Sequence, residues 1–207
     1  MQQYIGFDVS SKTIGYTSFI LTNKIEKLKI DYFSPEKKGT EFARLISLKN
    51  DITRILKIMK LDPLFSKSEK VYIGIEQSPL FIPHKSTAAT IVKLNIYTRI
   101  VGLTILEELG IEPLFIPVQT IRATLKKLSR STEKINKFDV PKTLETIISN
   151  INKEKWEFPF IKDKQNNIVL VKRGKYKGRV KEENFDLADG FAVALTHAFK
   201  NKKILNY

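Results

Sequence analysis

Apolar residues in the N-terminal part of the chain follow the pattern of β-strands. Residues 4–9 form a short and almost uninterrupted apolar run, typical of a buried strand, and residues 14–21 form a second run after a polar turn. Further along, apolar residues at every second position, Leu28, Ile30 and Tyr32, predict a third strand with one face in water. Because the links between these strands are short, we expect an antiparallel meander.

After Thr40 the spacing of apolar residues becomes helical. This spacing continues to Lys60, and Pro63 marks the end of the helix. Strand and helix patterns then alternate, with strands at 71–77 and 112–116 and helices at 86–109, 118–128 and from Asp139 onward. Gly110 is expected to close the long helix, and Asp139 and Pro141 to begin the last one. This order predicts an α/β fold, a five-stranded mixed sheet in which three antiparallel strands precede β-α alternation, with helices on both faces.

The segment 152–183 interrupts this alternation. It contains a β-rich stretch, a turn with glycine and a basic stretch, which together predict a β-hairpin inserted into a single domain of residues 1–207. Six basic residues lie between Lys172 and Lys181, and five of them, Lys172, Arg173, Lys175, Lys177 and Arg179, are candidate contacts. They form either a solvated edge that resists aggregation or a contact with nucleic acid. Two glycines would let a phosphate backbone approach closely, which favours nucleic acid.

The chain carries an excess of positive charge. Its 207 residues include 36 Lys and Arg against 22 Asp and Glu, a formal net charge of +14. With 42% hydrophobic residues the chain can bury a core, so the excess indicates a polyanionic partner, and nucleic acid is favoured over a role in solubility alone. The N-terminus resembles no signal or transit peptide, and no later run reaches about 18 uncharged apolar residues. We therefore expect a cytoplasmic protein that does not enter a membrane.

The composition also restricts any metal site. There is no cysteine, which excludes disulfides and thiolate zinc sites, and the two histidines, His84 and His197, are too few for a multi-histidine site. A metal would have to be held by carboxylates, and this donor set favours Mg²⁺ or Mn²⁺.

Four acidic residues occupy positions that suit one metal site. Asp8 and Glu76 each end an apolar strand, and Asp186 and Asp189 lie three positions apart at the start of an alanine-rich helical stretch. Because ligands gather beyond the carboxyl ends of strands in open α/β sheets, these acids are expected to share one crevice. Clustered carboxylates repel one another unless a cation lies between them. Four of them can hold two divalent ions about 3.5–4 Å apart, an arrangement that hydrolyses phosphodiesters.

Each of these acids also has an ordinary structural explanation. Asp186 and Asp189 could satisfy the first turn of a helix, Asp8 could begin an Asx turn with Ser10, and Glu76 could pair with a lysine. The occurrence of all four acids in a basic chain favours a metal-dependent nuclease.

Three stretches of the sequence resemble the motifs of a known nuclease family. The stretches YIGFDVSSKTIGYTSF, YIGIEQSPLF and DLADGFAVALTHA are similar to the three acidic motifs of the RuvC family of Holliday junction resolvases, within the RNase H-like superfamily. The resemblance covers most of the chain outside residues 152–183. It implies an RNase H-like fold and a homodimer that binds four-way DNA junctions in recombination, repair or replication. Such a dimer makes paired nicks by Mg²⁺- or Mn²⁺-dependent hydrolysis, with two ions in each active site.

The resemblance also implies roles for individual residues. The catalytic metal ligands would be Asp8, Glu76, Asp186 and Asp189. Arg122 in VQTIRATL and Lys142 in DVPKTLE match positions where the family has basic residues that contact DNA or assist its cleavage. Phe81 matches an aromatic wedge that helps to open the junction. The ordinary alternative is a solvated charge for Arg122 and Lys142, and a buried anchor for Phe81.

Some features depart from the family pattern and leave other functions open. Ser10 and Ser11 follow Asp8 where family members often have a glycine-containing turn, and the basic segment 152–183 suggests a divergent, phage-type branch. An actin-like sugar kinase is disfavoured, because it needs glycine-rich phosphate loops and normally two domains. A non-catalytic junction-binding protein and a broader flap or fork nuclease remain as alternatives.

Overall fold

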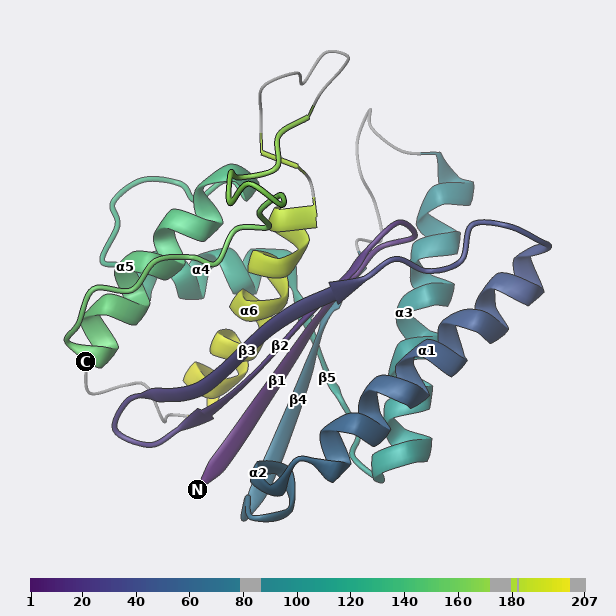
Figure 1. Cartoon of the computed structure of the whole chain (residues 1–207), viewed down its shortest axis with the longest axis horizontal. Helices are drawn as coiled ribbons and strands as arrows, with labels where there is room; N and C mark the ends of the chain where they lie inside the picture. Colours follow the sequence, from purple (N-terminus) through teal and green to yellow (C-terminus); the bar gives the residue numbers. More distant parts are fainter. Residues whose placement is uncertain (79–86, 172–179, 182, 202–207) are drawn as a thin grey trace.

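The computed structural model describes residues 1–78, 87–171, 180–181 and 183–201. Within these residues it has one five-stranded sheet with helices on both faces, which confirms the predicted fold class (Figure 1). The strands are β1 (Gln2–Val9), β2 (Ile14–Leu21), β3 (Ile25–Phe33), β4 (Lys70–Gln77) and β5 (Leu114–Pro117). The helices are α1 (Glu41–Leu61), α2 (Pro63–Ser66), α3 (Ala88–Leu109), α4 (Val118–Leu128), the 3₁₀ turn η1 (Lys137–Asp139), α5 (Val140–Asn152) and α6 (Glu183–Lys200).

The strands follow the order β3-β2-β1-β4-β5 across the sheet. As predicted, β1, β2 and β3 form an antiparallel meander, and β4 and β5 run parallel to β1. Tyr4, Ile5 and Phe7 of β1 are completely buried although they alternate between the two faces, because helices cover both sides of this central strand. The alternating pattern that predicted one wet face belongs to β3, which is an edge strand.

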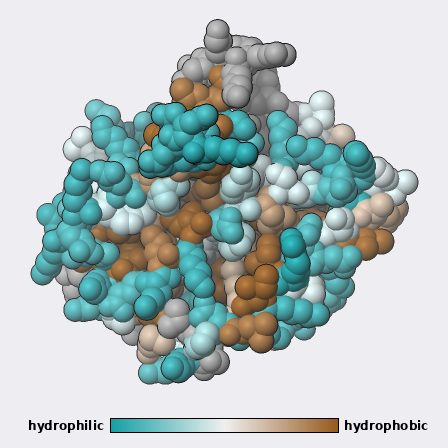
Figure 2. Space-filling view, viewed as in Figure 1, coloured by the Kyte–Doolittle hydropathy of each residue, from teal (hydrophilic) through white to brown (hydrophobic). Residues whose placement is uncertain are grey.

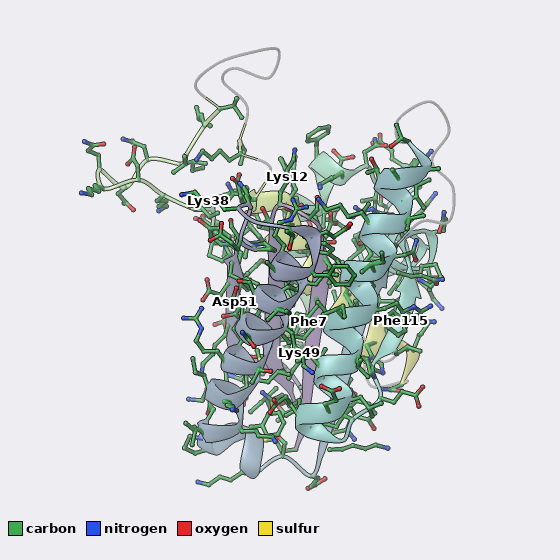
Figure 3. All side chains as sticks on the ribbon, turned by 90° about the vertical axis from the view of Figure 1, so that its right-hand side faces the viewer. Phe7, Lys12, Lys38, Lys49, Asp51 and Phe115 are labelled. Atoms are coloured by element: carbon green, nitrogen blue, oxygen red, sulfur yellow. The ribbon has the colours of Figure 1, made fainter. Side chains whose placement is uncertain are left out.

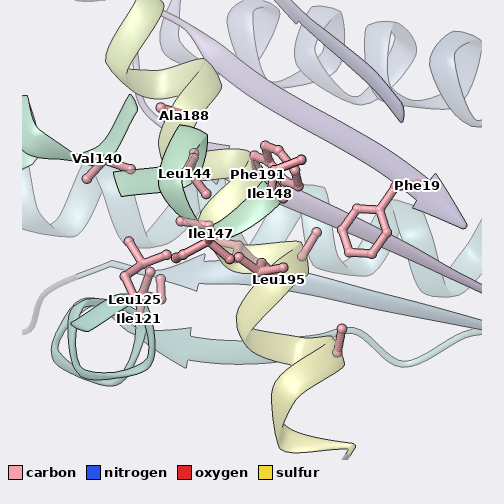
Figure 4. Packing of buried hydrophobic residues seen from close by; sticks show 14 of the residues in the cluster. Phe19, Ile121, Leu125, Val140, Leu144, Ile147, Ile148, Ala188, Phe191 and Leu195 are labelled. Atoms are coloured by element: carbon pink, nitrogen blue, oxygen red, sulfur yellow. The ribbon is translucent and has the colours of Figure 1, made fainter. Parts of the chain in front are cut away.

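One face of the sheet is covered by α4, α5 and α6. The helix α6 lies against β1, β2 and β4, and all of its residues from 184 to 198 are buried. Figure 4 shows side chains of the apolar cluster on this face, among them Phe19 of β2, Ile147 of α5 and Phe191 of α6. Small residues allow the close approach, since a Cβ on Gly6 would lie only 2.2 Å from the carbonyl oxygen of Gly190. The position of α6 on the strands is therefore narrowly defined.

The other face is covered by α1 and α3, which pack on each other (Figures 1 and 3). Phe7 of β1, Leu48 of α1 and Tyr97 of α3 belong to the apolar core on this side. As predicted, α3 ends at Gly110, which has the left-handed φ of 66°. By length and composition α3 could cross a membrane. In this fold it packs on α1 and the sheet, and 33% of its most apolar 18-residue stretch is buried. The rest of that stretch leaves apolar side chains at the surface.

One predicted element boundary and one predicted helix cap are wrong in detail. The strand β5 begins at Leu114 rather than at residue 112. The side chain of Asp139 does not cap α5, because its Oδ2 accepts a hydrogen bond of 2.9 Å from the backbone N–H of Asn136. Pro141 does lie in the first turn of α5, as predicted. The hydrogen bond to Asp139 stabilises η1, which orders the end of a stretch predicted as a loop.

The first part of the segment 152–183 contributes to the core. Trp156 and Phe158 pack edge to face with ring centroids 6.2 Å apart, and Phe158 is 4% exposed. Beyond them, antiparallel bridges join Lys162 to Ile168 and Leu170 to Val180, as in a hairpin. The basic residues 172–179 lie outside the described residues, so their place in a hairpin stays a prediction.

Candidate active site

Asp8 and Glu76 lie at the carboxyl ends of two neighbouring parallel strands. The register of β1 and β4 pairs Phe7 with Ile75, so Asp8 and Glu76 come next on adjacent strands. Both acids lie on the sheet face covered by α6, because they alternate with Phe7 and Ile75, which belong to the opposite core. This is the end of the sheet at which the sequence predicted a crevice.

The turn after Asp8 closes without glycine. The Oγ atom of Ser10 accepts hydrogen bonds from the backbone N–H groups of Lys12 (3.2 Å) and Thr13 (2.9 Å), and it donates one of 2.8 Å to the carbonyl oxygen of Thr13. A serine side chain thus supplies the contacts that close the turn. The departure from the family pattern at this position is accommodated, and Lys12 is left exposed.

The helix α6 brings the second pair of acids to the strand ends. Asp186 and Asp189 are only 5% and 3% exposed. A Cβ on Gly15 of β2 would lie 2.2 Å from the carbonyl oxygen of Asp186, so the first turn of α6 touches the strand directly. Gly15 is paired with Asp8 in the β1–β2 register, and the same contact therefore places Asp186 near Asp8. The structure thus brings together the four predicted acids from three elements.

The four carboxylates perturb one another. Burial raises the pKa of Asp8 well above its usual range, and the nearby charges of Glu76, Asp189 and Asp186 raise it further. Burial and the charge of Asp189 raise the pKa of Glu76 to about 8, although the Arg122 guanidinium opposes this. Burial also raises the pKa of Asp189, again against the effect of Arg122. When all four acids are ionised, the cluster holds more negative charge than Arg122 and Lys137 offset, which is the condition that a further cation would relieve.

Two basic side chains contact the acid cluster, the name we give to Asp8, Glu76, Asp186 and Asp189. Arg122 of α4 places Nη2 2.7 Å from Oδ1 of Asp189, and its side chain is 19% exposed. Lys137 of η1 places Nζ 3.0 Å from Oδ1 of Asp186. Burial lowers the pKa of Lys137, but the carboxylates of Asp186, Asp8 and Asp189 outweigh burial and hold this pKa above its usual value. Lys137 is therefore charged at neutral pH, and the ion pairs of Arg122 and Lys137 hold the acids of α6 in place.

Sequence reasoning missed Lys137. It favoured Lys142, which is exposed on α5, whereas the lysine that contacts an acid of the cluster is Lys137. A signal was present, because Asn136 and Asp139 form a reciprocal capping box around η1, and this pairing marks an ordered turn. Arg122 does reach the acid cluster. Contact with DNA remains a prediction for Arg122 and Lys142.

The other predicted DNA contacts lie outside the described residues. They are Phe81 and the basic residues Lys172, Arg173, Lys175, Lys177 and Arg179.

The donor atoms of the acid cluster suit a hard divalent cation. They are all carboxylate oxygens, and Oε2 of Glu76 is buried and accepts no hydrogen bond from the described residues. A buried carboxylate oxygen of this kind is costly unless a donor or a cation reaches it. Among the described residues, no three acidic or histidine side chains already surround one metal position. The structure therefore defines a carboxylate cluster partly neutralised by Arg122 and Lys137, with ligand chemistry appropriate to Mg²⁺ or Mn²⁺.

Comparison with known proteins identifies the fold. No protein-family model matches the chain, and no curated protein matches its sequence. T. thermophilus RuvC in complex with a Holliday junction substrate matches with a TM-score of 0.61 and 12% sequence identity, over 98% of this chain and 96% of that one. A second structure of Thermus thermophilus RuvC matches with a TM-score of 0.60 and 15% identity, over 97% of this chain and 95% of that one. The chain thus has a RuvC-like, RNase H-like fold, as its acidic motifs predicted.

Proposed function

Because the chain has a RuvC-like fold, we propose that it is a metal-dependent DNA endonuclease that resolves four-way junctions. The observation that carries the proposal is the gathering of Asp8, Glu76, Asp186 and Asp189 at the carboxyl end of the sheet. Three buried acids and the half-buried Glu76, placed in mutual repulsion, are a poor device for stability, since each charge is desolvated beside others of the same sign. They are the side chains that a site for phosphodiester hydrolysis requires.

The four acids would bind Mg²⁺ or Mn²⁺, two ions in each site. When bound, these ions would activate the attacking water and stabilise the charge that develops on the phosphate and on the leaving oxygen. Asp8 and Glu76 are held at fixed separation by adjacent strands, and Arg122 and Lys137 orient the two acids of α6. Lys137 also offers positive charge to a bound phosphate. Each hydrolysis adds one water across a P–O bond and leaves one phosphate end and one hydroxyl end.

Several observations support branched DNA as the substrate. The matching T. thermophilus RuvC structure is a complex with a Holliday junction substrate. The net charge of +14 favours a phosphate backbone, and the face seen in Figure 2 is mostly hydrophilic, with apolar surface in smaller patches. Lys12, four residues after Asp8, is exposed and lies at the same end of the molecule as Lys38 in Figure 3. These lysines would contact DNA beside the acid cluster.

Paired nicks require two active sites, so we expect the enzyme to be a homodimer. The best candidate surface is on α3, where Val92, Ile96, Leu103 and Leu106 are between 36% and 57% exposed. These residues line a groove of about 770 Å³, which continues to Phe115 of β5. Two copies of the α3 surface packed together would bury an apolar stripe that one copy leaves in water.

The proposed activity is tested with a labelled four-way junction, offered with Mg²⁺ or with EDTA. Wild type should make symmetric nicks only with metal. Asp8→Asn should bind the junction but cut it at least about 100-fold more slowly, because one carboxylate of the site is lost. Glu107→Gln is the matched control, because Glu107 is a half-exposed carboxylate on α3, paired with Lys49. This control should cut at the wild-type rate.

The same assay separates the alternatives when flaps, forks and plain duplex are included. Equal rates on junctions and flaps would favour a broader branched-DNA nuclease. Tight junction binding without cleavage in either metal would favour a non-catalytic junction-binding protein. If Asp8→Asn cuts as fast as wild type, the metal assignment is wrong.

The dimer is tested by light scattering during size-exclusion chromatography. Leu103→Glu should convert a dimeric mass into a monomeric one, because it would bury two like charges in the α3 contact. Leu61→Glu is the control, since Leu61 is 83% exposed at the end of α1. A wild-type protein of monomeric mass, with or without junction DNA, would contradict the proposed dimer.

A further inference from the structure

An exposed aromatic ring lies next to the acid cluster. Phe138 of η1 is 60% exposed, although it directly follows Lys137, whose Nζ contacts Asp186. Its ring packs on Phe185, with centroids 5.1 Å apart and the ring planes at 88°. Phe185 in turn directly precedes Asp186 and is 8% exposed. An ion pair and an aromatic pair therefore join η1 to α6 at consecutive residues.

This arrangement holds the Phe138 ring in a defined position. The backbone of η1 is closed by hydrogen bonds from the N–H of Asn136 to Asp139 Oδ2 (2.9 Å) and from the N–H of Asp139 to the carbonyl oxygen of Asn136 (3.0 Å). On the other side, Phe185 is fixed by the burial of α6. A ring anchored on one side and exposed on the other has lost much of its conformational freedom before any ligand arrives.

The surroundings of Phe138 suit a nucleotide better than a protein surface. Between residues 115 and 167, all of which the structure describes, Phe138 is the one large apolar side chain that is exposed, so this stretch of sequence does not present the several apolar side chains of a protein-docking surface. Its neighbours in sequence include Lys134, Lys137 and Lys142. An aromatic ring beside lysines offers a stacking surface for a base and charge for its phosphate.

We propose that Phe138 stacks on an unpaired nucleobase next to the phosphate that the acid cluster cleaves. The inference rests on the proposed function and adds a DNA-contacting residue to the same site. The bases near the crossover of a junction are the ones that can leave their stack, and every base presents a π-face, so this contact would select opened DNA rather than a sequence. Plain duplex, in which all bases are stacked, would not gain from it.

The test compares junction binding by full-length variants, measured by fluorescence anisotropy in EDTA so that no strand is cut. Phe138→Ala and Phe138→Leu should both weaken junction binding about tenfold, because neither side chain stacks on a base, and Phe138→Trp should retain wild-type affinity. Leucine keeps an apolar contact with Phe185 and so guards against simple unfolding. Phe42→Ala is the control, since Phe42 is 79% exposed on α1 in the opposite helical layer.

A junction that lacks the base beside the mapped cut identifies the contact directly. With this abasic junction, wild type and Phe138→Leu should bind equally, because the partner of the ring is gone. If Phe138→Leu weakens binding to the abasic junction as much as to the intact one, or if it binds the intact junction like wild type, the inference is overturned while the proposed nuclease stands. If wild type neither binds nor cuts junctions, both fail.

Discussion

The two helical layers on this sheet are packed to different degrees. In the layer of α6, every residue from 184 to 198 is buried, and the helix backbone touches strands at Gly6 and Gly15. In the layer of α1 and α3, only 33% of the most apolar 18-residue stretch of α3 is buried, and Leu103 is 50% exposed. The acid cluster lies wholly on the α6 side of the sheet, whereas charges on α3, such as Glu107, are paired at the surface.

This difference indicates that the position of α6 serves the site as well as stability. Acids that act on one phosphate must keep their separation to within a fraction of an ångström, and direct backbone contact between helix and strand provides that precision. The helix α3 has only to cover the sheet and to present a surface. Replacing a closely packed glycine with alanine should therefore lower the free energy of unfolding more in the α6 layer than in the α3 layer.

The largest effect is expected for Gly15→Ala. The new Cβ would lie 2.2 Å from the carbonyl oxygen and 2.5 Å from the carbonyl carbon of Asp186. These are backbone atoms, so α6 itself would have to move away from β2, and with it Asp186 and Asp189. We expect a loss of about 3 kcal/mol or more in the free energy of unfolding and loss of junction cleavage. Urea denaturation and the cleavage assay measure the two effects.

Gly102→Ala on α3 is the matched control, because it adds the same methyl group to the other layer. If Gly15→Ala unfolds at the wild-type urea concentration and cuts at the wild-type rate, the β2–α6 contact is looser than described.

Lys137→Ala should slow junction cleavage about 100-fold, because Asp186 would lose its cation and the phosphate a positive group. The lysine supports the site from η1 by a contact of 3.0 Å to Asp186. Single-turnover rates at saturating protein measure this effect separately from DNA binding. Lys57→Ala, which removes an exposed lysine from α1 in the other layer, is the control and should stay within about twofold of wild type. Equal losses in the two variants would contradict the special position of Lys137.

The α6 layer should also make stability depend on pH in the absence of metal. The pKa of Glu76 is raised from 4.5 to about 8, so the native state retains a proton that the unfolded chain has lost at neutral pH. The stability from this proton is fully present below about pH 4.5 and is lost as the pH rises through 8. Glu76→Gln removes the titration. In EDTA, the free energy of unfolding of this variant should exceed that of wild type by about 2 kcal/mol at pH 8 and by much less at pH 5.

Urea denaturation at the two pH values checks this expectation, with Glu107→Gln of the α3 layer as the control. Addition of Mg²⁺ at pH 8 should stabilise wild type more than Glu76→Gln, because the cation takes the place of the proton. A stability difference between the two proteins that is the same at pH 5 and pH 8 would show that the charge of Glu76 is not the cause.

Local sequence patterns were sufficient to predict most of the α6 layer. Strand ends located Asp8 and Glu76, and helical spacing located Asp186 and Asp189. Lys137 was missed because its role depends on a contact with Asp186, 49 residues away, and on a 3₁₀ turn that resembles a basic loop. Trp156 was predicted within an inserted hairpin, but it packs on Phe191, a contact that no local pattern encodes. The exposure of α3 also escaped prediction, since an apolar helix has the same composition whether the fold or a partner covers it.

Gly102→Ala is expected to have the smallest effect of these substitutions. Its Cβ would lie 2.8 Å from Cζ of Phe115, the far end of a half-buried side chain, with Arg99 4.4 Å over the ring. The ring can shift into the groove along α3, and alanine is favoured over glycine within a helix by about 1 kcal/mol, which offsets the cost of the shift. The free energy of unfolding should therefore change by less than about 1 kcal/mol. A loss as large as that of Gly15→Ala would mean that α3 is held as rigidly as α6, and close packing would then no longer distinguish the layer that contains the acid cluster.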